Sequence, residues 1–166
     1  RRRFRILHHL ATDQGSVRRA FPKASLARIE AQIADGERHH RGQVRFAVEP
    51  ALPFARVLRD VAPRERAIEV FGDLRIWDTE ENCGVLVYLL LADRDVEIVA
   101  DRGLPGHVGA AAWEAVCRRM ETAFRDGRYT EGVEAGIAEI NALLARHYPR
   151  EGRAGDDELP NRPVVL

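Results

Sequence analysis

Apolar and polar positions form their clearest pattern between residues 85 and 100. Residues 85–92 are an unbroken apolar run of strand length, which is typical of a strand covered on both faces. After Asp93 and Arg94, a second run at residues 95–100 places Val96 and Ile98 on one face. Two such runs on either side of two polar residues predict an antiparallel hairpin.

The predicted hairpin also determines which loop residues meet. Counting back from a two-residue turn at positions 93 and 94 places Gly84 level with Gly103. The same register places Val85 level with Arg102. Asp93 and Asp95 then belong to the opposite end of the sheet. The polar residues that enter the first strand and leave the second should gather at one end: Asp78, Glu80, Glu81, Asn82, Asp101 and Arg102.

The spacing of apolar residues predicts the remaining elements. Helices are expected near residues 24–40, 62–73, 108–126 and 129–147. Val44, Phe46 and Val48 share one face and predict a strand at 43–49, and residues 74–77 could add a short strand. The order strand, helix, strand implies a right-handed parallel crossover between 43–49 and 85–92. We therefore predict an α/β fold, a three-layer αβα sandwich around a small mixed β-sheet of about three to five strands.

The length of 166 residues suits one domain with a core of its own. We divide it into a basic N-terminal arm at 1–20, an αβα domain at 21–149 and an extended C-terminal tail at 150–166. The tail is rich in Gly, Asp, Glu, Pro and Arg, so it cannot form a core. Its apolar end, ELPNRPVVL, could dock as a strap along the domain.

Composition narrows the partners. Twenty-six basic and twenty-six acidic residues cancel, which argues against nucleic-acid binding. The longest apolar run, residues 85–92, is too short to be a transmembrane segment. Cys83 and Cys117 lack metal-ligand spacing and suggest a chain that does not rely on disulfides. We expect a soluble, cytoplasmic protein.

Residues 1–10 are basic, with scattered apolar positions, and they lack the continuous apolar core of a signal peptide. Such a segment could lie on an anionic membrane and make the protein peripheral to it. A solvated or packed arm is the simpler interpretation. The apolar positions are Phe4, Ile6, Leu7 and Leu10.

The acidic end of the sheet carries the candidate chemistry. Two carboxylates about 5 Å apart repel by roughly 3 kcal/mol at an effective dielectric constant near 20. A divalent cation, a shared proton, or Arg75 and Arg102 would each offset this repulsion. Oxygen ligands favour Ca²⁺ or Mg²⁺ over zinc. The candidate metal ligands are Asp78, Glu81, Asn82 and Asp101.

A metal at this end could activate water against a phosphate ester, with Arg102 binding the anion. The candidate catalytic residues are then Asp78, Asp101 and Arg102. The alternative is a solvated loop in which Asp78 caps a turn and Asp101 pairs with an arginine.

Other catalytic motifs fail on inspection. An apolar strand followed by Asp93-x-Asp95 resembles the nucleophile motif of haloacid-dehalogenase phosphatases, but Glu97 stands where that motif needs Thr or Val. No Arg follows either cysteine at six residues, no Gly-rich loop leads from strand to helix, and no serine elbow is present. These absences argue against covalent catalysis. His39 and His40 close a helix, where the helix dipole explains them better than a metal would.

The segment ERAIEVFGDLRIWDTEENCGVLVYLLLADRDVEIVADRGL resembles the TPM-domain family, in its compact bacterial branch. The resemblance continues through HRGQVRFAVEPAL before it and through WEAVCRRMETAFRDGRYTEGVEAGI and ELPNRPVVL after it, and covers nearly the whole chain from Phe21. It implies an αβα sandwich around a small mixed sheet, in agreement with the pattern above.

The resemblance implies several functions. The plant branch is associated with acid phosphatase activity and photosystem repair, and an animal branch with accessory roles at a membrane receptor. Bacterial relatives often accompany LemA-like membrane proteins, which implies a non-catalytic, partner-binding role in a membrane-associated complex as the alternative to a phosphatase. Family members usually carry Asn-Asn-Gly where this chain has Asn82, Cys83 and Gly84. If the second Asn binds metal or phosphate, Cys83 weakens that binding.

Overall fold

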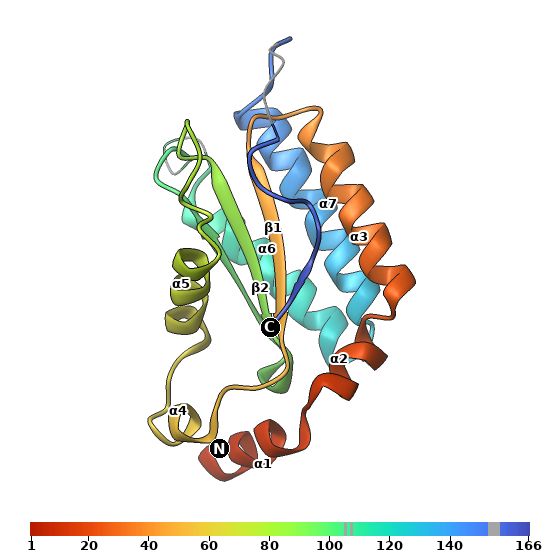
Figure 1. Ribbon diagram of the computed structural model, residues 1–166, viewed down its shortest axis with the longest axis vertical. Helices are drawn as coiled ribbons and strands as arrows, with labels where there is room; N and C mark the ends of the chain where they lie inside the picture. Colours follow the sequence, from red (N-terminus) through yellow and green to blue (C-terminus); the bar gives the residue numbers. More distant parts are fainter. Residues whose placement is uncertain (105, 107, 153–156) are drawn as a thin grey trace.

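A computed structural model describes residues 1–104, 106, 108–152 and 157–166. Helices and strands follow one another as predicted in the middle of the chain, with additional short helices near its start (Figure 1). In chain order the elements are α1 (Arg2–Ala11), α2 (Gln14–Ala20), α3 (Lys23–Glu37), β1 (Gln43–Glu49), α4 (Phe54–Leu58), α5 (Pro63–Asp73), β2 (Gly84–Leu90), the 3₁₀ turn η1 (Leu91–Asp93), β3 (Asp95–Ala100), α6 (Ala110–Arg125), α7 (Tyr129–His147) and β4 (Val164–Val165).

The sheet is mixed, as predicted, and has the order β3-β2-β1-β4. Strands β1 and β2 pair in parallel from Gln43 opposite Gly84 onward, and β2 pairs antiparallel with β3. Strand β4 pairs in parallel with the outer edge of β1. The predicted parallel pairing of β1 with β2 and the predicted antiparallel hairpin of β2 and β3 are therefore confirmed.

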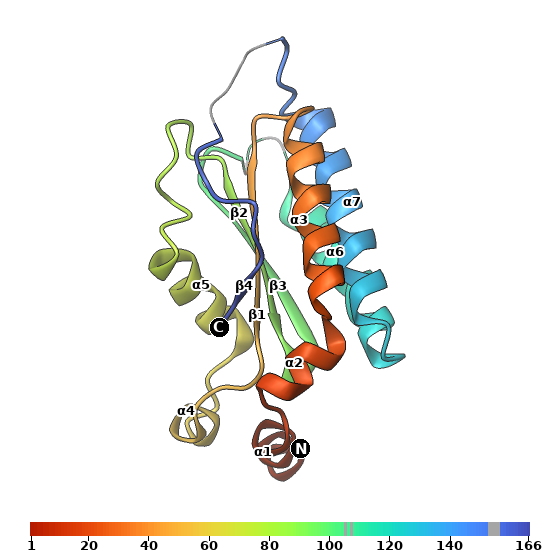
Figure 2. The same cartoon turned by 45° about the vertical axis from the view of Figure 1, so that its right-hand side comes forward.

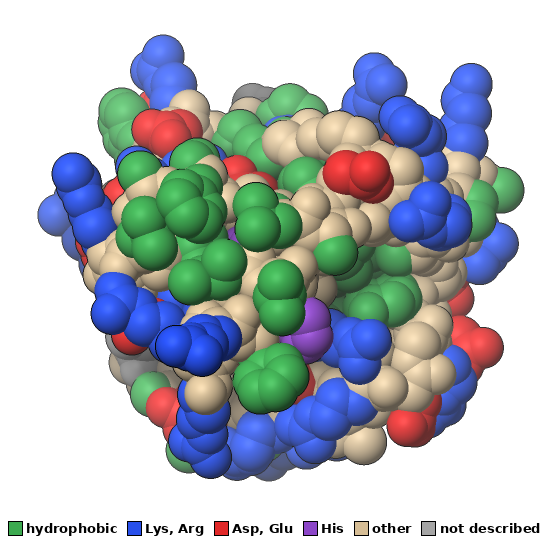
Figure 3. Space-filling view, turned by 90° about the horizontal axis from the view of Figure 1, so that it is seen from below, with side chains coloured by type: hydrophobic (Ala, Val, Ile, Leu, Met, Phe, Trp, Pro, Cys, Tyr) green, Lys and Arg blue, Asp and Glu red, His purple; other side chains and the backbone are tan. Residues whose placement is uncertain are grey.

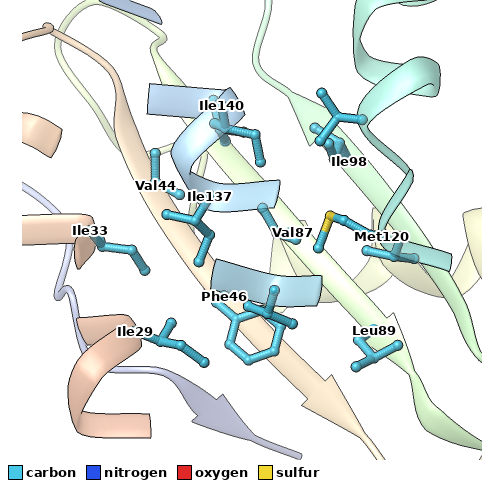
Figure 4. Packing of buried hydrophobic residues seen from close by; sticks show 14 of the residues in the cluster. Ile29, Ile33, Val44, Phe46, Val87, Leu89, Ile98, Met120, Ile137 and Ile140 are labelled. Atoms are coloured by element: carbon cyan, nitrogen blue, oxygen red, sulfur yellow. The ribbon is translucent and has the colours of Figure 1, made fainter. Parts of the chain in front are cut away.

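Helices cover both faces of the sheet, which makes the three-layer αβα sandwich (Figure 2). Helices α3, α6 and α7 lie over one face, and α5 lies over the other. Strand residues alternate between the two cores, since Phe46 and Val87 point to the three-helix side and Leu86 points to the α5 side. Figure 4 shows the first core, where Ile33 of α3 and Ile137 of α7 pack toward these strands.

The turn of the central hairpin is longer than predicted. Strand β2 ends at Leu90, and residues 91–94 form a 3₁₀ turn that closes with Arg94 in the left-handed region at a φ of 50°. Val85 consequently pairs with Ala100, two residues earlier than the predicted Arg102. A shift of two residues keeps every side chain on its predicted face, because the side-chain period of a strand is two.

Both ends of the chain are more ordered than predicted. The expected N-terminal arm contains two helices, and α1 packs against α4 and η1. The tail docks as the predicted strap: Leu159 is buried and β4 extends the sheet. The short strand considered at 74–77 is absent, because Leu74 ends α5 and Arg75 adopts a φ of 54° in the turn that follows.

Candidate functional site

Two loops make the acidic end of the sheet, as predicted despite the shifted register. The loop before β2 and the loop after β3 lie at the top of Figure 1. Their backbones are joined, because Gly103 N donates to Asn82 O at 2.9 Å and Asp101 N donates to Gly84 O at 2.8 Å. The two loops that carry the predicted ligands therefore meet.

Glycine is required where these backbones cross. A Cβ atom at Gly103 would lie 2.3 Å from the carbonyl oxygen of Glu81 and 2.5 Å from that of Asn82. Asn82 itself has a φ of 52°, which asparagine tolerates better than most residues. The close approach turns two main-chain carbonyl groups of the first loop toward the second.

Asp101 is the carboxylate with an incomplete set of partners. Its Oδ1 atom accepts a hydrogen bond of 2.7 Å from the backbone N–H of Arg102. Its Oδ2 atom is buried and accepts no hydrogen bond from any described residue. The Arg102 side chain is exposed, so it is available to a ligand that approaches from solvent. A buried carboxylate oxygen of this kind is energetically costly unless a donor or a cation completes it.

The Glu81 carboxylate accepts hydrogen bonds from two residues that the sequence did not connect with the site. Its Oε2 atom accepts hydrogen bonds from Arg41 Nη1 at 2.9 Å and from the Tyr148 hydroxyl at 2.7 Å. The Arg41 guanidinium also lies 3.9 Å from the centre of the Tyr148 ring. Burial and the neighbouring Glu81 carboxylate raise the pKa of Tyr148 to about 12, so the phenol remains a donor at neutral pH.

Asp78 is turned toward a different arginine. Its Oδ2 atom lies 2.9 Å from Arg75 Nη2, and both side chains are exposed. Arg75 also lies over the ring of Trp77, at 5.4 Å from its centre. Arg75, one of the considered ways to balance the charge, thus pairs with Asp78, and Glu81 pairs with Arg41. The alternative also expected an arginine partner for Asp101, and within the described residues Asp101 forms no such ion pair.

The predicted ligands therefore share one end of the sheet without forming one compact carboxylate cluster. Among the described residues, no group of three or more His, Cys, Asp or Glu side chains is placed to hold a metal ion. Asn82 and Asp101 are brought together by the backbone, whereas the side chains of Asp78 and Glu81 are held by arginines. A cation here would need main-chain or amide oxygens in addition to carboxylates.

Cys83 does not line this loop surface. Its side chain is buried in the core on the three-helix side, and its backbone N–H donates to Thr79 Oγ1 at 2.9 Å. Burial raises the pKa of the Cys83 thiol, which keeps the thiol neutral. A side chain at this position points into the core, so Cys83 leaves the oxygen atoms of the neighbouring loop unchanged.

Comparison with known proteins agrees with this architecture. The profile of the TPM domain matches residues 18–143, and the chain belongs to this family. A search of curated proteins found no match.

Two solved structures share the fold. The NMR structure of the BA42 protein from the psychrophilic bacterium Bizionia argentinensis has 25% sequence identity and a TM-score of 0.77, over 88% of this chain and 95% of that chain. The solution NMR structure of the N-terminal domain of a P. gingivalis protein has 18% identity and a TM-score of 0.62, over 77% and 80% of the two chains. Within the described residues, no helix has the length and apolar character needed to cross a membrane.

Proposed function

We propose that the loops around Asn82 and Asp101 bind a divalent cation, Ca²⁺ or Mg²⁺, and that this site assists the hydrolysis of phosphate esters. The observation that carries the proposal is the buried Oδ2 atom of Asp101, which has no hydrogen-bond donor among the described residues. A hard cation with oxygen ligands would complete it. The main-chain carbonyl oxygens of Glu81 and Asn82 lie next to Gly103, two residues after Asp101, and the Asn82 oxygen accepts a hydrogen bond from Gly103 N.

The arginine pairs at this end do not preclude such a site. Ion pairs between exposed side chains typically contribute about 0 to 1 kcal/mol, so a cation can compete with them. Asp78 is 55% exposed in its side chain, so its pair with Arg75 is of this exposed kind. Glu81 is held by two donors and is the harder of the two to recruit.

Each residue of the proposed site has a separate role in the hydrolysis. Asp101 and Asp78 hold the cation, and exposed Arg102 binds the phosphate oxygens of the ester. A bound cation would lower the pKa of a water molecule that it coordinates and would polarise the phosphoryl group. The family profile carries the name TPM phosphatase, which supports phosphate esters as the substrate class.

Calorimetric titration of the purified protein with Ca²⁺ and Mg²⁺ tests the cation site. We expect Asp101→Asn to weaken binding by at least about ten-fold, because a neutral amide replaces the central anionic ligand. The matched control is Asp126→Asn, since Asp126 is an exposed carboxylate at the end of α6 that pairs with Arg128. Equal cation binding by the wild-type protein and Asp101→Asn would refute the site.

Hydrolysis of p-nitrophenyl phosphate, with and without a chelator, tests the activity separately. Activity should require the cation and should be lost in Asp78→Asn and Asp101→Asn. Equal hydrolysis by wild type and both variants would mean that a contaminant is responsible. Cation binding without hydrolysis would retain the metal site and exclude the phosphatase.

The second candidate is a non-catalytic accessory module that binds a membrane-associated partner. It is favoured by the arginine pairing of Asp78 and Glu81, which balances their charge without a metal. Such a partner would bind through the basic start at residues 1–10 or through the apolar tail at residues 158–166. The tail is already used in the fold, because Leu159 is buried and β4 pairs with β1. Binding of a LemA-like partner that fails after deletion of residues 1–10, in a protein that binds no cation, would favour this role.

A further inference from the structure

Helix α1 presents three of its four large apolar side chains to solvent, whereas Ile6 is half-buried and packs against the core on the α5 side. Phe4, Leu7 and Leu10 are 70%, 59% and 65% exposed. Because they are three residues apart, they form one face of the helix. An amphipathic helix on a domain surface normally turns this face toward the core. In α1, by contrast, the face that carries Phe4, Leu7 and Leu10 is turned toward solvent.

The opposite face of α1, on which Ile6 also packs, attaches the helix to the domain mainly through polar contacts. Arg5 donates to the Asp93 carboxylate at 3.0 Å and to Asp60 at 2.8 Å. His9 is buried; its Nε2 atom lies 2.9 Å from Asp93 Oδ1, and its Nδ1 atom accepts a bond of 3.0 Å from Leu52 N. Burial raises the pKa of Asp93, but the bonds from His9 and Arg5 outweigh it, so the pKa is lowered and the carboxylate stays ionised. These bonds hold the apolar face outward.

Helix α4 extends the exposed apolar surface. Phe54 and Leu58 are both exposed and one helical turn apart, and α4 lies beside α1 at the lower end of the molecule, where Arg2 donates to the Leu58 carbonyl (Figure 1). Figure 3 views this end and shows hydrophobic side chains gathered among Lys and Arg side chains, with acidic side chains mostly toward the edge of the view. We call this surface the α1–α4 patch, formed by Phe4, Leu7, Leu10, Phe54 and Leu58.

The charge around the patch selects the chemistry of its occupant. Although the whole chain has a net charge of zero, four of its first five residues are arginine, and the first acidic residue is Asp13. Arg5 is paired with Asp60 and Asp93, so Arg1, Arg2 and Arg3 carry the positive charge of this end. A cavity of about 720 Å³ opens beside α1 and is lined by further arginines. An occupant of this surface must therefore offer apolar groups to the patch and anionic groups to the arginines that surround the patch. The arginines that line the cavity are Arg19, Arg94 and Arg128. Arg128 pairs with Asp126 and with Glu131, which also lines the cavity, so Arg19 and Arg94 are the ones that face an anionic occupant.

We propose that the α1–α4 patch docks the protein onto an anionic phospholipid bilayer. Phe4, Leu7 and Leu10 enter the boundary between headgroups and acyl chains, α1 lies along the surface, and the arginines contact lipid phosphates. The cavity beside α1 receives one headgroup. The candidate cation site lies at the other end of the sheet and faces away from the bilayer (Figure 1).

Cosedimentation of the full chain with vesicles tests the proposal. We expect binding to vesicles of phosphatidylcholine with phosphatidylglycerol, and weak binding to phosphatidylcholine alone. The double variant Leu7→Gln with Leu10→Gln should bind at least about ten-fold more weakly, because two apolar side chains no longer insert. Gln keeps the helix propensity of Leu, and both positions are exposed, so the fold is retained.

Two further variants separate apolar insertion from charge. The matched control is Ile68→Gln on α5, which removes a 54% exposed apolar side chain outside the patch and should bind as wild type does. Arg3→Gln should weaken binding by about five-fold, since a basic residue near an anionic surface contributes about 1 kcal/mol. Binding should also decrease with added salt.

Three outcomes would overturn the proposal. The first is a monomeric protein that binds neither vesicle. The second is equal binding of wild type and the Leu7→Gln, Leu10→Gln variant to anionic vesicles. The third is a concentration-dependent dimer of the wild-type protein in sedimentation velocity, together with no binding to vesicles. If the double variant abolishes this dimer, the patch belongs to an interface with a second copy of the chain.

Discussion

Glu37 is a buried acid at the end of α3, and its ionisation should make the stability of the protein depend on pH. Its side chain is 5% exposed, and its Oε1 atom accepts a hydrogen bond of 2.7 Å from Val44 N at the start of β1. Burial raises the pKa of Glu37 to about 8, against the opposing effect of the Val44 hydrogen bond. Glu37 is therefore mostly protonated in the folded protein at neutral pH.

The size and sign of the effect follow from this pKa. The folded protein keeps the proton up to about pH 8, whereas the unfolded chain releases it near 4.5. The folded state thus binds more protons between these values, and the free energy of unfolding decreases as pH rises, by about 1.4 kcal/mol per pH unit. Glu37→Gln removes the titration while its amide oxygen still accepts from Val44. The free energy of unfolding of the variant, minus that of wild type, should therefore increase by about 2 to 3 kcal/mol from pH 6 to pH 9.

Urea unfolding followed by circular dichroism at pH 6, 7.5 and 9 measures this difference. Glu30→Gln is the matched control, because Glu30 is exposed on the same helix, and its stability difference from wild type should stay constant over this range. The reasoning is refuted if the difference between Glu37→Gln and wild type is the same at pH 6 and pH 9.

Three further predictions concern the loops and the tail. Gly103→Ala should destabilise the protein by about 2 kcal/mol in urea unfolding and weaken cation binding, because its Cβ would lie 2.3 Å from a backbone oxygen; Gly72→Ala, with open space around it, should not. Tyr148→Phe should strengthen cation binding by about five-fold in calorimetric titration, since it releases one donor from Glu81, and unchanged affinity would exclude Glu81 as a ligand. Leu159→Ala should cost about 2 to 3 kcal/mol of unfolding free energy, and no cost would show that the tail is not part of the core.

Local pattern was sufficient for the central fold. The apolar run before Asp93 and the alternation after it predict β2 and β3, and helical spacing predicts α3, α5, α6 and α7 to within a few residues. These elements could be predicted because each buries a face whose residues repeat with the period of its own backbone. Helices α1 and α2 were missed, because residues 1–20 were interpreted as an arm. Helix α4 was missed too, since five residues are too few to show that period.

The acidic end could be predicted only in part. The hairpin placed Asn82 and Asp101 at one end of the sheet, because that follows from pairing two neighbouring strands. It could not show that Glu81 is held by Arg41 and Tyr148, which are 40 and 67 residues away in the chain. No periodicity links residues that meet only after α3 and α7 have packed on the sheet.

The reversed helix α1 separates the two kinds of information most clearly. The sequence by itself determined that residues 1–10 are basic and carry scattered apolar residues, and it predicted an arm where the structure has a helix. Which face would be buried was decided by the tertiary structure, because Arg5 and His9 bind Asp93, more than 80 residues away. A helix turns toward the domain the face that finds partners there, and at this end of the molecule the partners are charged.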